Sequence, residues 1–238
     1  MSGVFWTAVA GLGNLLGGAL VVAQPHTRQS VLKAFVGFGA GFMLAVVIVE
    51  MLPEALELRG GVLAVLVGYL LVHLTQHALT PHFHFGEETH TEAMVSPSVG
   101  VIALVGLLPH SFFDGVAISG GFAESQRLGL LIFGAILLHK VPSGVALASI
   151  MMASGNSRRA AFWGVVGLAA ASVLGALVTP LVAPLATYAL PLAAGVTLYV
   201  AASNLIPESQ HEHSWLVQGG IFAGVLAFFL LGMILPAH

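Results

Sequence analysis

Long apolar runs recur along the whole chain, and they constrain its fold more than any other feature. A helix needs about 20 apolar residues to cross the hydrocarbon core of a bilayer. Of the 238 residues, 58% are hydrophobic and 7% are charged, whereas a soluble domain carries about 25% charged residues. So few charges cannot cover the surface of a soluble protein of this size. The sequence therefore predicts an all-α polytopic membrane protein.

Polar residues, prolines and glycines divide the apolar sequence into eight predicted transmembrane helices. These spans are 3–23, 31–56, 61–79, 97–121, 127–153, 159–181, 184–206 and 215–236. The first span has no basic segment before it and no small-residue cleavage signature after it, so we expect a retained span and not a signal peptide. Cysteine is absent, which excludes disulfides and thiolate ligands.

The distribution of basic residues predicts the orientation of the chain. With eight spans, both termini lie on one side of the membrane. The basic residues in or beside the loops that follow odd-numbered spans are Arg28, Lys33, Arg158 and Arg159, and those on the other side are Arg59 and Arg127. Because basic loops are enriched in the cytoplasm, we expect both termini outside and a cytoplasmic histidine-rich loop at about 80–96.

Two stretches in the fourth and fifth spans follow one plan. One runs from His110 through Asp114 to a glycine, and the other runs from His139 through Ser143 to a glycine. In each, the histidine and the second polar residue are four positions apart and share one helical face. Polar clusters inside a span are costly and mark functional sites. Packing the two faces together gathers two imidazoles, a carboxylate and a hydroxyl, which suit a borderline divalent cation.

Proline and glycine accompany both polar faces. Pro109 precedes the first histidine, and Pro142 precedes the second polar residue of the other copy. A proline removes a backbone hydrogen bond, so the freed carbonyls can line a polar path where they face protein or a cavity. Gly115 and Gly144 each follow the second polar residue, and small residues let membrane helices approach closely. The repeat therefore predicts ligands, kinks and close packing together.

A second internal similarity lies in spans two and seven. Both end in a polar residue, two apolar residues and Pro-Glu, at Glu50–Glu54 and at Asn204–Glu208. These spans hold mirrored positions and run in opposite directions, which is the sequence pattern of an inverted repeat. Secondary transporters often have this symmetry, with the binding site near the midplane. We therefore expect one domain over 1–238, with repeats at about 1–80 and 158–238 around a central helix pair at 97–153.

The two motifs resemble those of the ZIP (Zrt/Irt-like protein) family of metal-ion transporters. That family carries patterns of the type His-Asn-x-x-[Asp/Glu]-Gly in span four and His-Glu-x-Pro-Glu-Gly in span five. The eight spans, the histidine-bearing loop and the Pro-Glu endings are also similar, so the resemblance covers the whole chain. It implies an eight-helix 3+2+3 bundle, often dimeric, that moves a divalent metal towards the cytoplasm.

The resemblance also implies which residues hold the metal. Carried over by position, the first metal site uses His110, Asp114, His139 and Ser143. Some bacterial members add a methionine from span two in an Ala-Gly-x-Met-Leu-Ala context, and Met43 stands in that context here. Met43 is therefore either a soft ligand or a core residue, and core packing is the commoner role of methionine.

The departures from the family pattern predict a single bound ion. A second site uses an asparagine where this chain has Ser111, an acid where it has Lys140 and a bridging glutamate where it has Ser143. It also uses a glutamate of span six, which 169–172 lack. An ammonium group cannot coordinate a cation. Lys140 either pairs with Asp114 and competes with metal, or extends to the interface.

Further polar residues are candidates for the pathway. Glu50 is deeper than Glu54 in span two and either gathers cations or meets Asn204 of span seven. The loop histidines His82, His84 and His90 either bind metal, as histidine-rich tracts do, or belong to a plain hydrophilic loop.

The function that these features favour is transport of a divalent metal across the cell membrane, a bacterial inner membrane, towards the cytoplasm. Zinc is the first candidate metal, and iron, manganese and cadmium are others. The expected partners are the metal, the bilayer and a second copy of the chain, with no cofactor and no nucleic acid. The alternative is an intramembrane zinc-dependent hydrolase acting on lipid, with Glu50 as its acid or base. A sensor with a structural metal is a third reading.

Overall fold

The computed structural model describes residues 2–23, 29–79, 97–206 and 215–234, and within them every regular element is helical. The long helices are α1 (Ser2–Ala23), α2 (Gln29–Val46), α4 (Gly61–Leu79), α5 (Pro97–Glu124), α6 (Gln126–Ala153), α7 (Arg158–Val178), α8 (Ala183–Tyr199) and α10 (Trp215–Ile234). Shorter elements extend three of them, namely η1 (Val47–Met51) with α3 (Leu52–Glu57), η2 (Thr179–Leu181) and η3 (Val200–Leu205). The boundaries lie within a few residues of the predicted spans.

Length and composition make this a multi-pass membrane protein. Among the described residues, 6 helices are long and apolar enough to cross a membrane, and the apolar stretches Gly61–Thr75 and Gln218–Ile234 are shorter. Large apolar side chains are exposed on the outer faces of these helices, for example Leu74 and Phe222. Such surfaces are unfavourable in water and suit contact with lipid. The all-helical membrane fold is thus confirmed.

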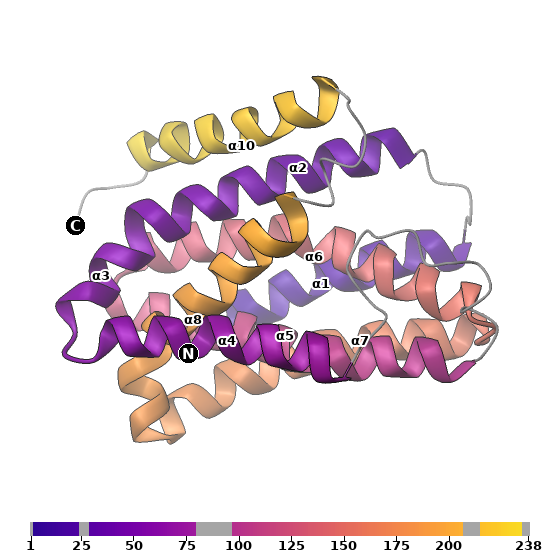
Figure 1. The fold of residues 1–238 in the computed structure, drawn as a ribbon, viewed down its shortest axis with the longest axis horizontal. Helices are drawn as coiled ribbons and strands as arrows, with labels where there is room; N and C mark the ends of the chain where they lie inside the picture. The colour runs from indigo at the N-terminus through magenta and orange to yellow at the C-terminus, as the bar shows by residue number, and fades with distance from the viewer. Residues whose placement is uncertain (1, 24–28, 80–96, 207–214, 235–238) are drawn as a thin grey trace.

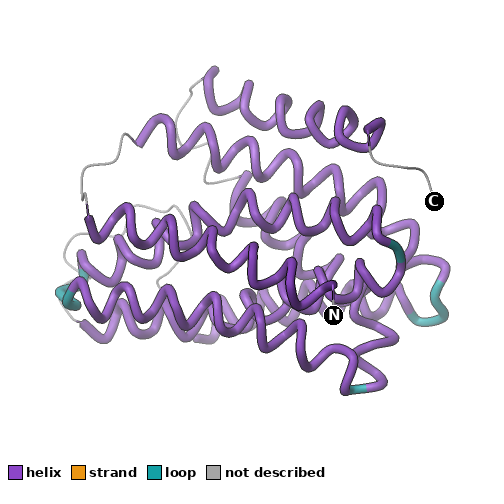
Figure 2. The backbone as a smooth tube through the Cα atoms, turned by 180° about the vertical axis from the view of Figure 1, so that it is seen from behind, coloured by secondary structure: helices purple, strands orange, loops and turns teal. Residues whose placement is uncertain are grey.

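The helices run roughly along one direction and form two groups of contacts (Figure 1). Helix α1 packs against α5, α6 and α7, and α5 also packs against α6 and α7. On one flank α10 lies along α2, and α4 pairs with α8. Seen from behind, α10 still lies along α2 at the edge of the bundle near the C-terminus (Figure 2). The central pair α5 and α6 therefore lies among other helices, where its polar groups are shielded from contact with lipid.

Spans two and seven share a local distortion. Each contains a π-helical segment, η1 in one and η3 in the other. The amide of Leu52 donates to the carbonyl of Val47, and the amide of Ile206 donates to the carbonyl of Ala201. In both bonds the donor is the residue that precedes the proline of the repeated Pro-Glu motif. Proline lacks an amide hydrogen, and π turns are frequent near functional sites.

The glycines of the central pair allow close helix contacts. A Cβ atom on Gly115 of α5 would meet the carbonyl oxygen of Ser172 on α7. A Cβ atom on Gly144 of α6 would meet the carbonyl oxygen of Asn14 on α1. Any larger residue would force these backbones apart. The glycine that ends each polar motif therefore allows its helix to pack directly against the backbone of a neighbouring helix.

Candidate metal site

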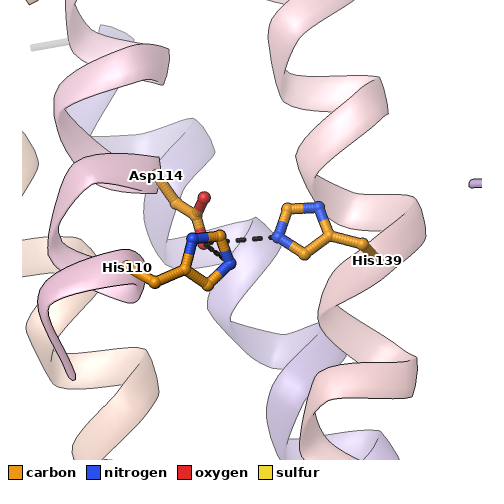
Figure 3. Close-up of side chains that lie close together, drawn as sticks. All are labelled: His110, Asp114 and His139. Atoms are coloured by element: carbon orange, nitrogen blue, oxygen red, sulfur yellow. Dashed lines mark hydrogen bonds and ion pairs between the residues drawn. The ribbon is translucent and has the colours of Figure 1, made fainter. Parts of the chain in front are cut away.

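The repeated faces of α5 and α6 meet as their sequence predicts. His110 and Asp114 project from one face of α5 toward His139 of α6 (Figure 3). Nε2 of His139 lies 3.3 Å from Oδ2 of Asp114, and Nε2 of His110 lies 3.6 Å from the same oxygen. All three residues are buried. The donor atoms of this cluster lie within 4.8 Å of one another.

The spacing of these atoms suits a tetrahedral metal ion. With bonds of about 2.0–2.1 Å, two ligand atoms of a tetrahedral site are about 3.3–3.4 Å apart. The two nitrogen-to-oxygen distances fall near this value, at 3.3 and 3.6 Å. Small side-chain adjustments would therefore place an ion between the three groups. Two imidazoles and a carboxylate are a donor set for zinc and similar borderline cations.

The tautomer of His139 favours metal binding. Its Nδ1 lies 3.3 Å from the carbonyl oxygen of Ala135, one turn earlier on α6. A carbonyl oxygen only accepts, so this contact holds the hydrogen on Nδ1. Oδ2 of Asp114, 3.3 Å from Nε2, also only accepts, so Nε2 must lose its hydrogen before its lone pair can bind an ion. Orientation of a metal-binding imidazole through its other nitrogen is the usual arrangement in metal sites.

Lys140 is buried beside the cluster and does not reach the membrane interface. Its side chain is 1% exposed, and its Nζ lies 2.7 Å from Oδ2 of Asp114. Nζ also donates to the hydroxyls of Ser172 at 2.7 Å and Ser111 at 3.5 Å. The three ammonium hydrogens thus have three oxygen partners. The ammonium contacts the same carboxylate oxygen that both histidines approach.

The remaining predicted site residues either have other contacts or lie outside what the structure describes. The hydroxyl of Ser143 donates to the carbonyl oxygen of His139 at 2.8 Å, so its hydrogen is engaged by the helix backbone. Met43 is 0% exposed and lies in the main hydrophobic cluster. Asn204 belongs to η3, and its side chain lies outside the described set. The loop histidines His82, His84 and His90 also lie outside the described residues.

Glu50 has a partner that the sequence did not reveal. Its two carboxylate oxygens each lie 2.9 Å from a guanidinium nitrogen of Arg127, at the start of α6. This bidentate geometry is the strong form of an arginine–carboxylate pair. Glu50 is therefore neutralised where η1 approaches the start of α6. The spare deep carboxylate that a hydrolase would need is already paired.

Two other polar residues near the site carried weak signals in the sequence. Ser172 of α7 bonds Lys140, yet a serine in an apolar span usually bonds only its own helix backbone. Asn14 of α1 is 0% exposed and is the sole amide side chain between residues 3 and 23. An isolated amide in a span was a detectable signal, but only packing shows which neighbours it has.

Comparison with known proteins decides the family. A family model described as the ZIP zinc transporter matches residues 85–237. The chain is also 30% identical, over 220 residues, to zinc transporter ZupT of Salmonella newport, of Salmonella typhimurium and of Salmonella typhi. Each alignment covers 84% of this chain and 84% of the relative. The chain belongs to the ZIP family.

Membership of the ZIP family makes this protein a membrane transporter of divalent metal and not an enzyme. The matched region includes both polar motifs of α5 and α6. The resemblance found in the motif spacing is thereby confirmed. The comparisons give no support to the alternative of a lipid hydrolase.

Proposed function

We propose that the chain moves zinc across a bacterial inner membrane towards the cytoplasm through one intramembrane site. His110, Asp114 and His139 bind the ion in this proposal, and Ser143 stands beside them. The observation that carries it is the approach of two histidine nitrogens to a single carboxylate oxygen, at 3.3 and 3.6 Å. The relatives named above are zinc transporters, which supports zinc as the cargo. Iron, manganese and cadmium fit the same donors.

Charge favours one ion and not two. Among the described residues close to the site, Asp114 is the sole carboxylate, and Lys140 supplies an opposing positive charge. A second dication would therefore face a site of no net negative charge in a medium of low dielectric constant, where bare charge is very costly. In this proposal Lys140 holds Asp114 in the empty state. Incoming metal displaces the ammonium, and its return favours release.

The proposed architecture is an eight-helix 3+2+3 bundle with inverted repeats at about 1–80 and 158–238 around 97–153. Its support is the matched π segments η1 and η3, each followed by one residue and then a proline. The contacts that α10 makes with α2 and α4 makes with α8 bring together helices of the two outer repeats. A site at the centre of such a repeat is typical of secondary transporters.

The proposed orientation has both termini outside and the loop at about 80–96 in the cytoplasm, from the distribution of basic residues. The histidines of that loop, His82, His84 and His90, are proposed to receive metal after it leaves the site. Glu50 and Asn204 are proposed to lie along the outer part of the pathway. Met43 is proposed as a soft ligand, and the working form is proposed to be a homodimer.

Zinc uptake by proteoliposomes tests this function. The wild-type chain should give saturable uptake, and His110→Ala and His139→Ala should reduce it to the level of empty vesicles. Thr7→Val is a matched control, because among the described residues the buried Thr7 hydroxyl bonds only the carbonyl of Gly3 on its own helix, at 2.8 Å. Zinc uptake that survives loss of both histidines would contradict the proposed site, and absence of uptake by the wild type would contradict the function.

A further inference from the structure

Asn14 of α1 is a buried polar residue to which the site described above gives no role. Its side chain is 0% exposed. Within the part of the chain that the structure describes, the buried side-chain polar atoms lacking a hydrogen-bond partner are both amide atoms of Asn14 and Nδ1 of His110. A buried polar group without a partner carries a free-energy penalty and calls for an explanation. The three atoms belong to two residues, and one of these is in the metal cluster.

The packing of α1 places Asn14 beside the site on α6. A Cβ atom on Gly13 would lie 3.1 Å from Cβ of Lys140, and one on Gly144 would touch the carbonyl oxygen of Asn14. Asn14 is therefore at the level of the turn that follows His139. In Figure 3 the pale indigo ribbon of α1 passes behind the labelled side chains.

Along the bundle, Asn14 on α1 lies at about the same height as His110 on α5. Helices α1 and α5 run antiparallel, and a Cβ atom on Gly3 would lie 2.9 Å from Cα of Ser119. Counting residue for residue from that contact puts Asn14 opposite Leu108. The helices α5 and α6 can be counted in the same way from the contact between His139 and Asp114. This count puts Gly144, the residue of α6 that touches Asn14, opposite Pro109 of α5. At about 1.5 Å of rise per residue, both counts place Asn14 within one helical turn of His110.

This position is on the side of the site that leads to the start of α5. Helix α5 begins at Pro97, next to the loop that the proposed orientation puts in the cytoplasm. An ion that leaves Asp114 in that direction passes the level of Asn14. An amide oxygen is a neutral, hard donor, and it can replace a water ligand without adding charge.

We propose that the amide oxygen of Asn14 is a ligand for the divalent cation on its way out of the site, and that it sets the preference among metals. This inference rests on the proposed function. A neutral oxygen ligand shifts a site of two imidazoles and one carboxylate towards harder cations such as Mn²⁺, relative to softer Cd²⁺. It also gives the metal a partner between Asp114 and the aqueous side.

The test is competitive uptake of Mn²⁺ and Cd²⁺ into proteoliposomes, with thermal unfolding of the same samples. Asn14→Leu keeps the size of the side chain and removes its oxygen. The ratio of Mn²⁺ to Cd²⁺ uptake should fall at least about threefold, and total uptake about tenfold, the range seen when groups that support a metal site are lost. The unfolding midpoint should stay the same or rise, because an unpartnered amide has been replaced by an apolar group.

A second variant keeps the test decisive if Asn14→Leu does not fold. Asn14→Asp retains the oxygen and adds charge, so it should slow release and raise the ratio of Mn²⁺ to Cd²⁺. Thr7→Val, on the same helix, should leave this ratio unchanged. An unaltered ratio in the Asn14 variants, with uptake by the wild type intact, would overturn this inference alone. No uptake by the wild type would overturn the proposed function instead.

Discussion

Two carboxylate–cation pairs in this protein have similar chemistry and different surroundings. Asp114 and Lys140 form the first pair at 2.7 Å, with side chains that are 2% and 1% exposed. Glu50 and Arg127 form the second at 2.9 Å, with side chains that are 15% and 22% exposed. The first pair shares its carboxylate oxygen with two histidines, whereas the second is bidentate and self-contained. The two pairs therefore differ in the partners of the carboxylate more than in the charges themselves.

Removing the shared carboxylate should have the largest effect. In Asp114→Ala the two imidazoles lose the anion between them, and Lys140 remains as an uncompensated charge beside the site. Zinc uptake should fall by at least about 100-fold, beyond the range caused by loss of supporting groups. Uptake assays in proteoliposomes measure this. Glu50→Ala is the matched control, and an equal loss of uptake in both variants would remove the distinction between the two pairs.

Lys140→Met tests whether the ammonium competes with metal. Breaking a buried ion pair typically costs about 3–5 kcal/mol, so the metal-free variant should unfold at a lower temperature. Zinc should restore more stability than it does in the wild type, because binding to the folded state stabilises it. Equilibrium dialysis should show about tenfold tighter zinc retention, following the removal of a like charge. Unchanged retention together with unchanged uptake would contradict the displacement of Lys140 by metal.

Substitutions in the pair of Glu50 and Arg127 should have moderate effects of opposite sign on zinc uptake. Glu50→Gln leaves Arg127 unpaired, so cations are repelled and the KM for zinc uptake should rise about threefold. Arg127→Gln leaves Glu50 unpaired, so the KM should fall by a similar factor. Both changes should shrink at high salt because exposed charges are screened. Shifts of the same sign in the two variants would show that the pair acts through structure and not through charge.

Ser143→Ala should have the smallest effect. The serine hydroxyl donates to the carbonyl of His139, and a serine that bonds its own helix contributes little to stability. Zinc uptake should stay within about twofold of the wild type, since no charge is lost. A loss comparable to that of Asp114→Ala would instead make Ser143 an essential ligand, equal to its counterpart in the other copy.

Much of the fold could be predicted because helix length and polar spacing are local properties. Apolar runs of about 20 residues predict spans, and the structure places helices within a few residues of them. The spacing of His110 and Asp114 likewise puts both on one face of α5. Repetition of the motif at His139 then indicates that two helices share one site. None of these inferences depends on distant contacts.

Residues with one obvious role in the sequence can have another in the fold. Lys140 was open to two readings, since a lysine stem can reach the interface or stay within the bundle. Ser172 decides between them, because it meets the ammonium from α7 at 2.7 Å. In the sequence Glu50 was a pathway residue that either gathers cations or meets Asn204, whereas the fold brings Arg127 at the start of α6 to it. Partners that lie far apart in the chain cannot be recognised from the sequence alone.

The sequence by itself determined that this is a helical membrane protein with histidine and carboxylate side chains in repeated motifs on two helices. Those properties follow from hydrophobic length and helical periodicity. Only the tertiary structure decided which polar groups share one carboxylate oxygen and which three oxygens contact the ammonium group of Lys140. It also placed Asn14 beside the site with no hydrogen-bond partner for its amide among the described residues. In a medium with no water to satisfy polar groups, such contacts depend on how helices pack, and packing joins residues far apart in the chain.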